Sequence, residues 1–272
     1  MSKAGVADVW PLSPMQQGLH FLARYDGEGP DVYLLQLVFD LEGALDAGAL
    51  RRAAEELLRR HDNLRAGFRT LRSGEPVQVV PRGVELPWQE IDLSGRAGAA
   101  AEEKAAEILA ADWNRRFDLA RPPLLRFTLL RLGDRRHRLL FTAHHILADG
   151  WSTQLLVGEL FELYRRGGDG TGLPAPPPYR DYLAWLAEQD DQKAMAEWAR
   201  VLDGAEPALV APAQAPGGSA RPPRSSSSCP PTSPPRCATT PAGTATPAPP
   251  SPRGRGPSSW ACSPAGRTWC AG

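Results

Sequence analysis

The chain of 272 residues lacks the features that mark several common classes of protein. Cysteine is absent from residues 1–211, which excludes a disulfide framework and a thiolate zinc site there. No apolar run approaches the roughly 20 residues that a membrane-spanning helix needs. Residues 1–14 contain no apolar signal core. These absences favour a soluble, cytoplasmic protein that is not embedded in a membrane.

An abrupt change of composition divides the chain near residue 210. From Pro212 to Gly272 there is no Leu, Ile, Val, Phe, Tyr, Met or acidic residue, while all four cysteines and six arginines lie there. Such a segment buries too little apolar surface to offset its ordering entropy, so we expect residues 207–272 to form a disordered Pro/Arg/Ser-rich tail. A Pro/Ser/Thr linker, a basic adhesive tail and a frameshift in a GC-rich gene each explain the composition. We favour the frameshift, because every aliphatic residue beyond Ala disappears at once.

Residues 1–211 also lack a basic excess. Six of the 31 basic residues lie in the tail, so 25 basic side chains face 31 acidic ones in this part of the chain. A mildly acidic body counts against a nucleic-acid-binding protein, which usually presents a basic face.

Along residues 1–206, segments whose apolar residues recur with the period of a helix are interspersed with segments typical of strands. Helices are predicted at 14–25, 46–60, 99–117, 151–166 and 179–202, and strands at 32–41, 64–71, 77–80, 88–93, 124–132 and 137–143. The second and third strands, and the last two, are expected to form hairpins. This order predicts an α/β fold in the broad sense, an α+β mixed sheet with flanking helices.

Two of these helices have faces that the spacing specifies. Ser13, Pro14 and Gln16 form a capping-box start to the first helix. Its apolar residues are expected to share one face, and so are those of the helix after residue 150; they are Met15, Leu19 and Leu22, and Leu155, Leu156, Leu160 and Leu163.

The segment from His144 to Gly150 (HHILADG) joins a predicted strand to a predicted helix. Loops held by rigid elements often carry catalytic groups, and histidine can exchange a proton near neutral pH. If the strand continues through His145, the two imidazoles lie on opposite faces of the sheet. Asp149 could orient a ring, pair with an arginine or cap the next helix. Gly150 could permit an unusual backbone shape or be a plain turn residue. Two adjacent histidines could bind a metal, but the sequence suggests no third ligand nearby.

At this point the sequence resembles the condensation domains of nonribosomal peptide synthetases, which belong to the chloramphenicol acetyltransferase-like acyltransferases. His144 to Gly150 matches the HHxxxDG motif of that family. Three further segments match other family motifs in the expected order: Leu12 to Leu22 (LSPMQQGLHFL), Arg60 to Phe68 (RHDNLRAGF) and Tyr179 to Trp185 (YRDYLAW). The sequences of these motifs are most similar to those of the condensation-domain subgroup that accepts a D-configured donor.

The resemblance implies a function and a role for each site residue. Such domains form a peptide bond between an acyl or peptidyl thioester and an aminoacyl thioester, both carried on phosphopantetheine arms of partner carrier proteins. His145 would be the catalytic residue, either as a general base on the amine or as a group that orients the amine and stabilises the tetrahedral intermediate, and His144 would be a supporting residue. Asp149 would form a salt bridge to Arg65, and Gly150 would leave the channel open. No metal and no bound cofactor are implied.

The resemblance also implies that residues 1–206 are one lobe of a two-lobed fold with its active site between the lobes. We therefore expect the isolated chain to have little condensation activity. The alternatives are a CoA-dependent acyltransferase, an epimerase of the same superfamily, and a non-catalytic remnant that only binds carrier proteins.

Overall fold

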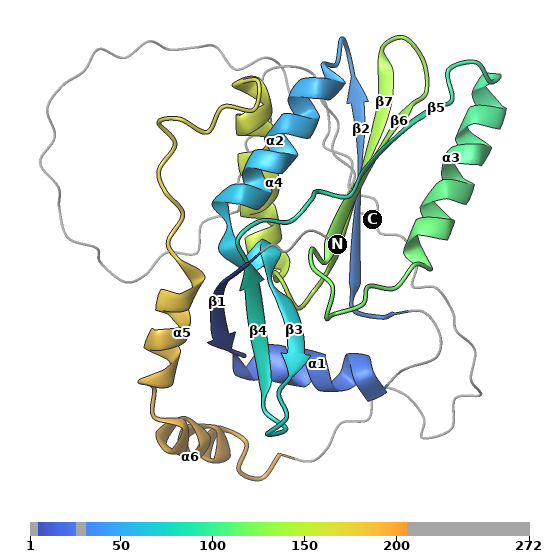
Figure 1. Ribbon diagram of the computed structural model, residues 1–272. Coiled ribbons are helices and arrows are strands. Elements are labelled where there is room, and N and C mark those ends of the chain that lie inside the picture. The colour runs from blue at the N-terminus through green and yellow to red at the C-terminus, as the bar shows by residue number, and fades with distance from the viewer. Residues whose placement is uncertain (1–4, 26–30, 206–272) are drawn as a thin grey trace, which may run out of the picture.

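The computed structural model describes residues 5–25 and 31–205 (Figure 1). The predicted tail lies outside these residues. The elements in chain order are β1 Val6–Pro11, α1 Pro14–Tyr25, β2 Leu34–Glu42, α2 Ala47–Arg60, a 3-10 turn Asp62–Arg65, β3 Gly67–Thr70, β4 Pro76–Pro81, β5 Trp88–Asp92, α3 Gly98–Trp113, β6 Leu125–Arg131, β7 Arg136–His144, α4 Gly150–Arg165, α5 Tyr179–Ala187 and α6 Asp191–Val201.

The strands form two sheets, which confirms a mixed α/β fold. The larger sheet has the order β2-β7-β6-β5, antiparallel except for the parallel pair β5–β6, and the smaller has the order β1-β4-β3. Both predicted hairpins are present, as β3–β4 and β6–β7. β1 was not predicted, because its six residues (VADVWP) show no regular alternation of apolar and polar side chains and end at a proline, which gives little local signal.

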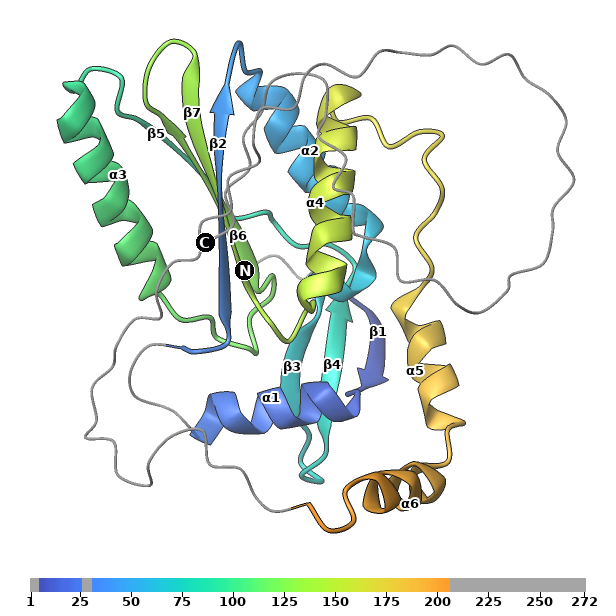
Figure 2. The same cartoon turned by 180° about the vertical axis from the view of Figure 1, so that it is seen from behind.

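Helices cover both faces of the larger sheet. Figures 1 and 2 show α3 on one side of it and α2 with α4 on the other. Each face has its own apolar cluster: Leu139 and Phe141 of β7 belong to the cluster beneath α2 and α4, whereas Leu140 packs with Ala105 of α3. This alternation along β7 follows from the two-residue period of a strand.

Helix starts agree with the capping residues in the sequence. The Gln16 N–H donates to Ser13 Oγ at 3.3 Å and the Ser13 N–H donates to Gln16 Oε1 at 3.0 Å, so the predicted capping box is present. Asp46 caps α2 through the Ala49 N–H at 2.8 Å. Within the described residues, no helix is both long and apolar enough to cross a membrane.

Three expectations about helices were wrong. The segment 179–202 is two helices, since Asp190 accepts the Lys193 N–H and starts α6. On α1, Met15 is 74% exposed, and the buried side chains are those of Gln16 and His20. On α4, Leu155 is 64% exposed while Leu156, Leu160 and Leu163 are buried as predicted.

Candidate active site

The histidine loop, residues 145–149, joins the end of β7 to the start of α4. β7 ends at His144, so this ring lies on the α3 face of the sheet with Leu140 and Thr142, as predicted. His145 lies beyond the strand, and strand alternation therefore does not place it. The next two side chains, Ile146 and Leu147, are buried in the core beneath α4 and anchor the loop.

The His144 ring is fully buried and has a defined environment at each nitrogen. Its Nδ1 accepts the backbone N–H of Ile146 at 3.0 Å. Its Nε2 makes no hydrogen bond within the described residues but lies 3.5 Å from Oδ2 of Asp31, whose side chain is only 3% exposed. A nitrogen that accepts a hydrogen bond carries no proton, so the ring proton resides on Nε2. His144 is thus a structural part of the loop, consistent with the supporting role expected of it.

The half-buried His145 has partners at its backbone N–H and at one ring nitrogen. Its backbone N–H donates to the Tyr33 carbonyl at 2.9 Å. Its Nδ1 lies 3.4 Å from the Ala148 carbonyl oxygen, which can only accept. The ring proton is accordingly assigned to Nδ1, which leaves a lone pair on Nε2. A neutral imidazole in this tautomer can accept a proton through Nε2.

Asp149 caps the next helix and is not paired with Arg65. Its Oδ1 accepts the Ser152 N–H at 2.7 Å at the start of α4. The hydrogen bonds with Ser152 are the main reason that the pKa of this exposed carboxyl is lowered. Of the three interpretations of Asp149 from the sequence, the helix N-cap therefore holds in this structure.

Arg65 binds elsewhere, so the expected ion pair is absent from the described residues. Its guanidinium donates to Oδ1 of Asp62 at 2.5 Å and to the carbonyls of Leu58 and Arg59 at 3.0 and 2.7 Å. These contacts hold the end of α2 to the turn that follows it. Arg65 supports the fold near the loop rather than the loop itself.

Gly150 is exposed and has no backbone requirement for glycine. It is not among the glycines of positive φ, so the expected unusual backbone shape is not found. A Cβ atom added there would meet no atom within 4 Å among the described residues. The open space beside this position is consistent with the close substrate approach that the resemblance implies.

Residues of the first two motifs fasten the histidine loop from outside. Gln16 Nε2 donates to the Ile146 carbonyl at 3.1 Å, and Gln16 Oε1 accepts from Gln78 Nε2 at 2.9 Å. Asn63 Nδ2 donates to the Leu147 carbonyl at 3.2 Å. The motifs identified the two segments that carry Gln16 and Asn63, but they did not predict the hydrogen bonds from these segments to the loop. Neither Gln16 nor Asn63 was expected to brace the loop.

The fourth motif also reaches this region. Tyr179, at the start of α5, packs against Trp10 with ring centroids 6.2 Å apart. Burial raises the pKa of the Tyr179 phenol, although a hydrogen bond with Ser13 acts in the opposite direction. The charge of Asp149 acts on the same phenol, so all four motif segments converge on one end of the larger sheet.

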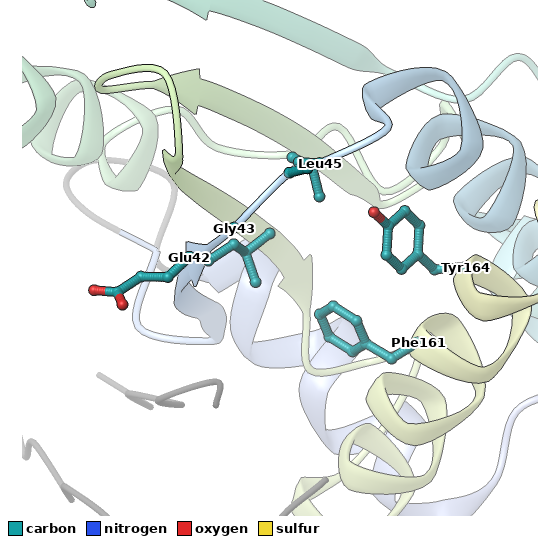
Figure 3. A pocket seen from close by; sticks show the side chains of 7 residues that line it. Glu42, Gly43, Leu45, Phe161 and Tyr164 are labelled. Atoms are coloured by element: carbon teal, nitrogen blue, oxygen red, sulfur yellow. The ribbon is translucent and has the colours of Figure 1, made fainter. Parts of the chain in front are cut away.

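One pocket lies at the other end of that sheet (Figure 3). Leu41, Leu45, Phe161 and Tyr164 supply most of its apolar lining, and the Glu42 carboxylate points away from the two rings. Leu34 pairs with His144 whereas Glu42 pairs with Arg136, so the pocket lies roughly 25 Å of strand away from the histidine loop. No cluster of three potential metal ligands occurs among residues 5–25 and 31–205.

Comparison with known protein sequences identifies the family of the chain. A family model described as the condensation domain matches residues 6–232. The chain is 34% identical over 210 residues to bacitracin synthase 1 of Bacillus licheniformis, covering 76% of the chain and 4% of that protein. It is 38% identical over 221 residues to chondramide synthase cmdD of Chondromyces crocatus, covering 77% and 6%.

Solved structures show the same fold. The first condensation domain of the calcium-dependent antibiotic synthetase, in complex with a substrate analogue, is 25% identical with a TM-score of 0.62, covering 74% of this chain and 49% of that one. A mutant starter condensation domain of rhizomide synthetase gives 0.66 at 21% identity, over 76% and 48%. The chain thus spans about half of these solved domains. Since the family model covers most of the sequence, the chain belongs to the condensation domain family.

Proposed function

We propose that residues 5–205 are the histidine-bearing lobe of a domain that forms peptide bonds between two carrier-bound thioesters. The observation that supports this most directly is the half-buried His145, held by backbone contacts with Nε2 as its proton-accepting nitrogen. The names of the relatives, a bacitracin synthase and a chondramide synthase, agree with this substrate class.

The proposed reaction assigns one proton transfer to His145. The acceptor amine attacks the carbonyl carbon of the donor thioester, and Nε2 takes the proton that the amine loses. The tetrahedral intermediate then collapses, the carbon–sulfur bond breaks, and the same proton passes to the leaving thiolate. The phosphopantetheine thiols belong to the substrates on their carrier proteins, so the lobe itself needs no bound cofactor for this chemistry.

Gly150 and Asp149 have secondary roles in this proposal. Gly150 keeps the space beside the loop open for the acyl chain, and its backbone N–H begins α4, where helix polarity favours a developing oxyanion. Asp149 fixes the start of that helix by capping it. Arg65 acts at a distance, by holding the end of α2.

We further propose that this lobe is insufficient for turnover. It spans about half of the solved condensation domains, and Trp151, beside the loop, is 75% exposed within the described residues. The polypeptide of 272 residues, mixed with donor-loaded and acceptor-loaded carrier proteins, should give no more product than its His145→Ala variant. Product above that background, detected by mass spectrometry, would contradict this part of the proposal.

A chimera tests the chemistry itself. Residues 5–205 replace the matching half of the calcium-dependent antibiotic synthetase domain, and peptide bond formation is measured with loaded carrier proteins. The chimera should form product, and His145→Ala should reduce the rate by about 10²-fold or more. A folded chimera that is inactive, or one whose activity survives His145→Ala, would refute the proposal. Transfer from a soluble CoA thioester without carrier proteins would point to a simple acyltransferase.

A further inference from the structure

Asp31 is a buried carboxylate that no sequence motif identifies. It lies three residues before β2, and its side chain is 3% exposed. Burying a charge is costly unless the charge is paired and hydrogen-bonded. Burial opposes ionisation of Asp31, but contacts with His144, the Tyr33 N–H and the charge of Arg116 outweigh it and lower the pKa of the carboxyl. Asp31 is therefore an anion facing the histidine loop.

The two oxygens of this carboxylate have different partners. Oδ1 accepts the backbone N–H of Tyr33 at 3.0 Å. Oδ2 lies 3.5 Å from Nε2 of His144. The Tyr33 carbonyl in turn accepts the N–H of His145 at 2.9 Å. A single acidic side chain thus connects, directly or through one peptide unit, to both histidines of the loop.

The Asp31 carboxylate favours the same tautomer of the His144 ring as the hydrogen bond from the Ile146 N–H. With the proton on Nε2, the ring presents an N–H to the carboxylate and a lone pair to the Ile146 N–H at 3.0 Å. With the proton on Nδ1 instead, the Nδ1–H would face the Ile146 N–H, and the Nε2 lone pair would face the Asp31 carboxylate. Both of these contacts are repulsive. Through its Nδ1 lone pair the ring also holds the Ile146 N–H, within a turn in which the Leu147 N–H donates to the His144 carbonyl at 3.0 Å.

We propose that Asp31 is a positioning residue for the histidine loop: it holds the His144 proton on Nε2 and thereby sets the turn that presents Nε2 of His145. The importance of this for catalysis rests on the proposed function, whereas the tautomer and the turn do not. Asp31 acts through its neighbours and touches no substrate.

The substitution Asp31→Asn separates the two contacts, since an amide has one acceptor oxygen in place of two. If that oxygen keeps the Tyr33 N–H, an NH₂ group faces His144 and favours the lone pair on its Nε2. If it turns to His144, the Tyr33 contact is lost. Asp40→Asn is the matched control, because Asp40 pairs with Arg138 across the same two strands at 2.7 Å but contacts neither histidine.

The experiment is ¹⁵N NMR of the imidazole rings in the full chain of 272 residues, whose five histidines can be assigned by single His→Gln substitutions. In the wild type, Nε2 of His144 should be protonated and Nδ1 should not. Asp31→Asn should shift the ring signals of both His144 and His145, and Asp40→Asn should leave them unchanged.

Two results would overturn the proposal. One is an Nδ1 proton on His144 in the wild type, a measurement that needs no variant. The other is a set of His144 and His145 signals that Asp31→Asn leaves unchanged. In the active chimera, Asp31→Asn should lower kcat about tenfold or more with little change in KM, since small displacements of a reacting group are costly. An inactive chimera with the NMR result as expected would refute the proposed reaction and leave the positioning role standing.

Discussion

Replacing Asp112 by alanine should cost a large part of the stability of the lobe. Asp112 lies near the end of α3 and accepts from three neighbouring strands: from Arg126 Nε at 2.5 Å, from Thr142 Oγ1 at 2.5 Å and from Gln36 Nε2 at 3.0 Å. Gln36 pairs with Thr142 and Thr142 with Arg126, so the three donors form one row across β2, β7 and β6.

The magnitude follows from burial. The side chains of Arg126 and Asp112 are 4% and 10% exposed. Removing one partner of a buried ion pair leaves an uncompensated charge and costs about 3–5 kcal/mol. Arg126 would keep the carbonyls of Asp112 and Arg115 and the ring of Phe117, 4.3 Å away, which places the expected loss near the lower end of that range. Domains of this kind have a total stability of about 5–15 kcal/mol.

The assay is urea denaturation followed by circular dichroism, for the wild type, Asp112→Ala and the double variant Asp112→Leu with Arg126→Met. Replacing both charges by apolar groups should cost much less than the single change, because no unpaired charge remains. A loss below about 1 kcal/mol for Asp112→Ala, or a double variant that is less stable than the single one, would refute this account of the network.

Three further changes test other contacts. Asp149→Ala should lower the free energy of unfolding by about 1 kcal/mol and Asp149→Asn by much less; equal losses in urea would contradict the capping role. Asn63→Ala should speed hydrogen exchange of the loop amides at 145–148, and unchanged exchange would count against its bracing role. Burial opposes ionisation of Glu159, but Arg60 and His61 outweigh it and lower its pKa. Its stabilisation is complete above the ordinary carboxyl pKa of about 4.3 and is lost as the pH falls through the lowered one. Thermal unfolding of Glu159→Gln should therefore depend less on acid pH than that of the wild type.

Much of the fold could be predicted from local sequence. The capping box at Ser13, the N-cap at Asp46 and both hairpins depend on residues only a few positions apart, so short patterns record them. The break at Asp190 left a signal too, because a capping aspartate stands inside an otherwise helical run. β1 depends on pairing with β4, some 70 residues later in the chain, and no local pattern encodes that partner.

The site was predictable in position but only partly in detail. The motif located His144 and His145 correctly at the end of a strand, because strand and helix periods flank them. The predicted ion pair between Asp149 and Arg65 was wrong. A carboxylate one residue before a helix lies closer to the first backbone N–H groups of that helix than to an arginine elsewhere in the chain. Asp31 was missed altogether. An aspartate that follows a proline is typical of an exposed loop, and Asp31 is buried only because of contacts made in the tertiary fold.

The fastenings of the histidine loop have a consequence for how the protein acquires its site during synthesis. The contact of Gln16 with Ile146 spans 130 positions, and that of Asn63 with Leu147 spans 84. Closing such long stretches of chain is slow, because the entropy of each closure is lost before its contacts form. The segments that carry Gln16 and Asn63 leave the ribosome before β7 and the histidine loop, so these two contacts cannot form until the loop has been synthesised. A truncated nascent chain that ends before residue 146 should therefore fold its hairpins and helices loosely at most, and the arrangement of the two histidines should be among the last parts of the lobe to become native.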